Sequence, residues 1–106
     1  MLFRSDPKTD SWSEGPPAPT ARSGGQAALL GDLIVFHGGE TSKGTFNENE
    51  AFDTKAGRWI VLAPGPTGLH ASAGASIGDS VYYPGGSTGP GGDAITDQLL
   101  VFRLRR

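Results

Sequence analysis

Histidine and acidic side chains are the groups in this chain that could bind a metal or move a proton. His37 and His70 show no spacing typical of a zinc site. Glu48 and Glu50 are two residues apart, so on a strand their carboxylates would share one face. Such a pair can hold a metal or do acid–base work. We expect instead that both are solvated charges at a sheet edge, and we predict no metal site.

Other signals of catalysis or of a cofactor are weak. The chain has no cysteine, which excludes a disulfide, a thiolate metal site and a cysteine nucleophile. Residues 39–44 lack the Gly-Lys-Ser/Thr ending of a phosphate-binding loop. Gly91-Gly92-Asp93 is a single partial copy of a calcium-binding glycine repeat, whose sites need stacked copies. We therefore expect no catalytic residue, no cofactor and no enzymatic activity.

Size and charge indicate one small domain. The chain has 106 residues and a formal net charge of −2, which gives no electrostatic case for binding nucleic acid or an anionic membrane. No apolar run approaches the roughly 20 residues of a membrane span. Residues 1–11 contain no apolar segment of the kind found in signal peptides. We expect a soluble protein, with the cytoplasm favoured and the compartment left open.

The sequence repeats itself at an offset of 47 residues, which indicates a repeat architecture. Four landmarks share this offset: Trp12 with Trp59, Pro19-Thr20 with Pro66-Thr67, Gly31-Asp32 with Gly78-Asp79, and Gly38-Gly39 with Gly85-Gly86. Phe52 then matches Phe102 at an offset of 50, so the second copy carries an insertion after its paired glycines. An insertion confined to one place marks a surface loop.

Each copy reads as a series of short strands. Gly31-Asp32 separates the apolar segments 27–30 and 33–36, which predicts a hairpin with a type II′ turn. The second copy repeats this pattern around Gly78-Asp79, and further strands are predicted at 49–53, 58–62 and 99–103. Asp10 stands where the later copy has Gly57, and both are expected to adopt positive φ in a tight turn. No segment has a helical period.

These features resemble the kelch repeat family. The resemblance rests on the paired glycines after an apolar strand, on Phe52-Asp53 and on Trp59, and the stretch from Pro19 to Gly24 resembles the opening of such repeats. The second copy departs from the pattern, because Leu69 replaces Arg22 and Pro84 replaces His37. The resemblance implies β-propeller blades and, most often, a role in protein interaction.

The predicted fold is all-β, with kelch-type blades that are each a four-stranded antiparallel meander. A single domain covers residues 1–106: residues 1–14 are a leftover third and fourth strand, 15–62 a full repeat, and 63–106 a repeat without its fourth strand. Small residues are expected on the innermost strands. The predicted structural residues are the apolar plates and the paired glycines: Trp12, Gly38, Gly39, Trp59, Gly85 and Gly86.

Two blades do not close a ring, because propellers have about four to eight. Two apolar faces would remain uncovered. The chain could form a homo-oligomer that completes a ring, or it could be a fragment of a larger kelch protein. In a third arrangement, the N-terminal strand pairs with residues 99–103 of the same chain.

A meander places the tight turns at one end and the long connections at the other. We expect the long connections to bind a protein partner, because binding residues concentrate on loops that a rigid scaffold holds. The candidate binding residues are Arg22, Glu40, Lys43, Asn47, His70, Ser87 and Asp93. The alternatives are a carbohydrate-binding propeller and a sugar-mutarotase-like enzyme, in which Arg22 of several copies would line a channel.

Overall fold

The computed structural model describes residues 2–105, so Met1 and Arg106, the ends of the predicted domain, lie outside it. Within this range every regular element is a β-strand, and no helix that could span a membrane is present. The strands are β1 (Leu2–Asp6), β2 (Ser11–Gly15), β3 (Gln26–Leu30), β4 (Leu33–His37), β5 (Glu40–Thr41), β6 (Gly44–Thr45), β7 (Asn49–Asp53), β8 (Arg58–Val61), β9 (Ala75–Ile77), β10 (Ser80–Pro84) and β11 (Leu99–Arg103).

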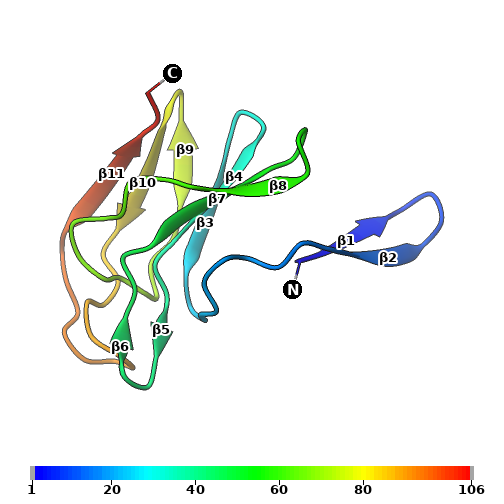
Figure 1. Cartoon of the computed structure of the whole chain (residues 1–106). Helices are drawn as coiled ribbons and strands as arrows, with labels where there is room; N and C mark the ends of the chain where they lie inside the picture. Colours follow the sequence, from blue (N-terminus) through cyan, green and yellow to red (C-terminus); the bar gives the residue numbers. More distant parts are fainter. Residues whose placement is uncertain (1, 106) are drawn as a thin grey trace.

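These strands form two main sheets and two short hairpins, all antiparallel (Figure 1). The first sheet has the strand order β3-β4-β7-β8, and the second has the order β9-β10-β11. The predicted all-β class and the predicted four-strand meander are confirmed. The ribbon β5-β6 was not predicted, since its segment was expected to be a loop.

The two copies follow the same backbone path. A bridge between Ser23 and Glu40 in the first copy recurs between His70 and Ser87 in the second. The amide of Thr54 donates to the carbonyl of Asp32, and that of Leu104 donates to the carbonyl of Asp79. Each pair of contacts obeys the sequence offset, so the repeat seen in the sequence is a repeat of structure.

The tight turns have the predicted conformations. Gly31 and Gly78 both have φ of 60°, as the first central residue of a type II′ turn requires. Asp10 adopts φ of 50° where Gly57 adopts 69°. Leu30 pairs with Leu33 across the turn, so the register of β3 and β4 is fixed by a two-residue connection.

The core lies between the two main sheets. Because side chains alternate along a strand, one face of β4 and β7 presents Val35 and Ala51 to the second sheet. Val81 and Tyr83 of β10, in the second sheet, pack against this face. All four side chains are buried, as are those of Leu30 and Leu69. One inter-sheet interface therefore holds the main body together.

The hairpin β1-β2 lies on the other side of the first sheet from β9-β10-β11 (Figure 1). Its strands pair only with each other in the part of the chain that the structure describes. The predicted alternative in which the N-terminal strand pairs with residues 99–103 is therefore wrong for this chain. The connection that follows the hairpin is tied to β8, because the Trp59 side chain donates to the carbonyl of Pro16.

The tryptophans occupy matching strand positions in different surroundings. Trp59 packs on Phe52, with ring centroids 5.5 Å apart, and its indole N–H donates to the carbonyl of Pro16 at 2.8 Å. Trp12 pairs across its hairpin with Ser5 and is 73% exposed. The expectation of a buried plate is wrong for Trp12, because its cross-strand neighbour is a serine and its hairpin stands apart from the sheets.

Candidate functional site

The long connections meet at one end of the molecule, opposite the tight turns (Figure 1). We call this the long-connection end; it comprises residues 15–22, 40–48, 63–70 and 87–96. The hydroxyl of Thr45 donates to the carbonyl of Thr88 at 2.8 Å, which joins β6 to the 87–96 segment. The amide of Gly91 donates to Oε2 of Glu40 at 2.7 Å. Connections from both repeats are thus tied into one surface.

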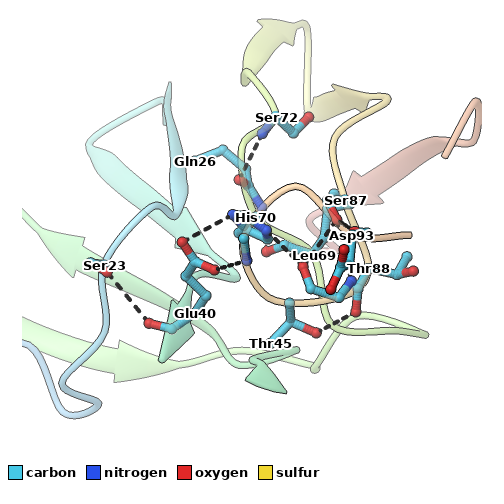
Figure 2. Close-up of polar contacts among 12 residues, drawn as sticks. Ser23, Gln26, Glu40, Thr45, Leu69, His70, Ser72, Ser87, Thr88 and Asp93 are labelled. Atoms are coloured by element: carbon cyan, nitrogen blue, oxygen red, sulfur yellow. Dashed lines mark hydrogen bonds and ion pairs between the residues drawn. The ribbon is translucent and has the colours of Figure 1, made fainter. Parts of the chain in front are cut away.

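Glu40 and His70 are the centre of this network (Figure 2). Nδ1 of His70 lies 3.5 Å from Oε1 of Glu40, and Nε2 lies 2.7 Å from the carbonyl oxygen of Gly89. A carbonyl only accepts hydrogen bonds, so Nε2 carries a proton. The His70 side chain is almost fully buried. His70 therefore connects β5 to the 87–96 segment from below the surface.

Ser87 lies in one of two Gly-x-Ser-x-Gly matches, 85–89 and 74–78, that the sequence reasoning overlooked. With His70 and Glu40 nearby, the residue types match those of a Ser-His-acid triad. The geometry does not: the Ser87 hydroxyl faces the carbonyl oxygens of Gly89 and Asp93, which take its single proton, and His70 Nε2 bonds Gly89 instead of that hydroxyl. No helix follows either serine in the described chain, as a nucleophile elbow requires. The serine is a buried structural contact.

Buried polar groups also join the two repeats further inside. The Gln26 amide donates to the carbonyl of Leu69 at 3.1 Å and accepts from the amide of Ser72, so its orientation is fixed. Its NH₂ group faces Nδ1 of His37 at 3.3 Å, which makes Nδ1 the acceptor and puts the His37 proton on Nε2. Burial, and then the charge of Arg22, lower the pKa of His37, so the ring is neutral near pH 7. Of the two ring nitrogens, Nδ1 accepts a hydrogen bond and Nε2 has no partner among the described residues.

Arg22 forms a buried ion pair. Its guanidinium lies 2.9 Å from Glu50, donates to the carbonyls of Phe36 and Glu48, and stacks 4.3 Å from the Phe36 ring centre. The side chains of Arg22 and Glu50 are 0% and 4% exposed. Burial lowers the pKa of Arg22, and the nearby carboxylates of Glu50 and Glu48 oppose that shift. The expectation that Glu50 is a solvated edge charge is wrong, because Arg22 reaches it from a distant segment.

The seven predicted binding residues therefore separate into two groups. Lys43 and Asp93 are exposed at the surface of the long-connection end. The others mostly hold the surface together: Asn47 donates to the carbonyl of Gly65, Glu40 and His70 pair, and Arg22 and Ser87 are internal. Ile95, which was not predicted, is 83% exposed on the same segment as Asp93. Its exposure depends on the loop path, which no sequence pattern reported.

A small pocket of about 90 Å³ lies where residues 63–66 cross β11. His37, Asn49 and Tyr83 line it together with Leu100, Val101 and Phe102. Three buried polar atoms at this place have no partner among the described residues: His37 Nε2, Asn49 Oδ1 and the Tyr83 hydroxyl. Burial raises the pKa of Tyr83 to about 12. These atoms are covered by the surrounding chain, so they do not face an open site.

Residues 2–105 contain no group of three or more His, Cys, Asp or Glu side chains that could hold a metal ion. The candidate site is a surface at the long-connection end, made of exposed loop residues on a buried polar support. No family model matches this chain, and no curated protein matches it either.

Proposed function

We propose that this chain is a non-enzymatic, kelch-type interaction module that binds a protein partner through its long-connection end. The observation that carries the proposal is the support beneath that surface, where Glu40, His70 and Ser87 lock connections from both repeats together. A loop that is ordered before binding loses less conformational entropy when a partner arrives. Rigid, exposed loops are the usual place for recognition residues.

In this proposal the two main sheets are adjacent blades of a β-propeller. Support comes from the meander order of β3-β4-β7-β8, from the matching bridges of the two repeats, and from the hairpin beside the first sheet. The hairpin would be the outer part of a preceding blade. The three bodies then follow one another around an axis in chain order.

The recognition residues in this proposal are Lys43, Asp93 and Ile95. Lys43 and Asp93 supply charges of opposite sign on the ribbon β5-β6 and on the 87–96 segment. Ile95 supplies an exposed apolar contact between them and β11. An apolar contact with flanking charges is typical of a protein-binding surface rather than of a pocket for a small molecule.

Charge reversal at each end of the molecule tests the proposal. Lys43→Glu and Asp93→Lys alter the long-connection end, and Lys55→Glu alters an exposed lysine at the tight-turn end as a matched control. The immobilised chain is incubated with a lysate of the source organism, and captured proteins are quantified by mass spectrometry. We expect at least about a tenfold loss of one captured protein with Lys43→Glu or Asp93→Lys, and no loss with Lys55→Glu. Equal capture by all variants, or equal loss in the control, would contradict the proposal.

A further inference from the structure

The two main sheets pack against each other through positions whose equivalents in the other repeat lie on the outer faces of the molecule. From the first sheet, Leu30, Val35 and Ala51 are at most 1% exposed. They contact the face of the second sheet that carries Val81 and Tyr83. Each sheet also has an opposite face, and the repeat offset shows which residues of that face correspond to the buried ones.

The outer face of the second sheet repeats the buried face of the first. Ile77, Tyr82 and Val101 stand at the repeat positions of Leu30, Val35 and Ala51, and Tyr82 pairs with Val101 across β10 and β11. Ile77 is 70% exposed and Val101 is 52% exposed, whereas Leu30 and Ala51 are 1% and 0% exposed. This outer face therefore carries apolar residues at the positions that form the interface in the first sheet, but no described element packs on them.

The outer face of the first sheet repeats the buried face of the second. Ile34, Phe36 and Phe52 stand at the positions of Val81, Tyr83 and Phe102. Ile34 is 37% exposed, whereas Val81 is fully buried. The hairpin β1-β2 lies near Phe52, and Arg22 stacks on Phe36, whereas Leu29 of β3 and Ile34 of β4 remain exposed on this face.

We propose that a second copy of this chain docks head to tail, with the outer face of its second sheet on the outer face of the first sheet. The occupant follows from continuity, because the exposed apolar residues of the two outer faces stand at the repeat positions of the interface that the chain already forms internally. The contact is heterologous, since each copy contributes a different face. This inference rests on the repeat positions and not on the proposed binding at the long-connection end.

Docking requires the hairpin to move outward. Residues 5 and 6 of β1 stand at the repeat positions of Phe52 and Asp53, so β1 holds the place of a third strand, which β11 of the incoming copy would take. The strands β1 and β2 pair only with each other in residues 2–105. The segment Gly15–Pro17 connects the hairpin to the body and serves as the pivot.

The test is the mass of the whole chain by size-exclusion chromatography with light scattering, across a range of protein concentrations. Ile34→Lys places a charge on one face and Ile77→Lys places a charge on the other. Ala56→Lys is the matched control, because Ala56 is exposed in the tight turn between β7 and β8, outside both faces. Circular dichroism of each variant shows that the strands have formed.

We expect the wild type and Ala56→Lys to exceed the 11.0 kDa of one chain, and each face variant alone to have the mass of one chain. An equimolar mixture of Ile34→Lys and Ile77→Lys should form a dimer and nothing larger, because each variant retains the face that the other lacks. A wild type that stays at one chain contradicts the proposal. So does a folded mixture that remains monomeric, or an Ile34→Lys or Ile77→Lys variant that keeps the wild-type mass.

Discussion

At one equivalent pair of positions, the first repeat has a buried ion pair and the second repeat has two apolar side chains. In the first repeat, Arg22 and Glu50 form a buried ion pair beside Phe36. In the second repeat, Leu69 and Leu100 stand at the positions of that pair, beside Tyr83. The strand register and the bridging contacts are nevertheless the same. The comparison teaches that turns and register fix the backbone path, whereas the interior accepts either charge or hydrocarbon.

Removing one charge of the pair should have the largest effect. Arg22→Ala leaves the Glu50 carboxylate buried without its cation, so we expect a loss of about 3–5 kcal/mol in the free energy of unfolding. Urea denaturation followed by tryptophan fluorescence measures this loss. Lys55→Ala, which breaks the exposed pair with Asp32, is the control and should cost less than about 1 kcal/mol.

A double variant tests whether the first repeat accepts the apolar pair of the second. Arg22→Leu with Glu50→Leu gives the first repeat the residues of the second, and we expect a stability within about 1–2 kcal/mol of the wild type. If the double variant lost as much stability as Arg22→Leu and Glu50→Leu lose in sum, the first repeat would not accept the leucine pair of the second at this position.

Alanine at the first glycine of each pair should have the next largest effect, and it should differ between repeats. A Cβ at Gly38 would overlap the carbonyl oxygen of Leu69, and φ is 75° there. At Gly85, where φ is 63°, the nearest atom is the carbonyl oxygen of Thr96 at 3.5 Å. We expect Gly85→Ala to cost about 1–2 kcal/mol from the backbone conformation alone, and Gly38→Ala to cost clearly more. Equal costs in thermal denaturation would mean that the two repeats do not differ in packing at this point.

Tyr83→Phe should have the smallest effect at neutral pH. It removes a buried hydroxyl that has no partner among the described residues and installs the residue type of Phe36, so stability should stay equal or rise by about 1 kcal/mol. At high pH the effect grows, because the pKa of Tyr83 is about 12 in the folded state and near 10 when unfolded. Between these values only the unfolded chain ionises, so the wild type loses stability as pH rises.

The alkaline loss is measured by urea denaturation from pH 8 to pH 11. We expect Tyr83→Phe to lose less stability over this range than the wild type, and Tyr82→Phe, on the other face of β10, to behave as the wild type does. Identical pH profiles for wild type and Tyr83→Phe would show that the hydroxyl is not buried.

The strands and turns were predictable because their signals are local. Gly31-Asp32 and Gly78-Asp79 mark the hairpins, and the apolar segments on either side of them mark the strands. The ribbon β5-β6 was missed, since its strands have only two residues each and contain no apolar segment. Local patterns therefore sufficed for the sheets and failed for the connections.

The candidate site was only partly predictable. Sequence reasoning found the long-connection end and the residues Lys43 and Asp93 on its surface. It could not find that Glu50 is buried, because its partner Arg22 lies 28 residues earlier in the chain. Nor could it separate His70, which supports the surface, from residues that form it, since burial depends on the packing of segments from both repeats.

Cross-strand NMR at the two bridges decides whether the two copies of the repeat share a backbone path, with their long connections joined at one end. We predict nuclear Overhauser contacts between Ser23 and Glu40 and equivalent contacts between His70 and Ser87. Contacts at only one of these bridges, or contacts between β2 and β11, would contradict this shared path.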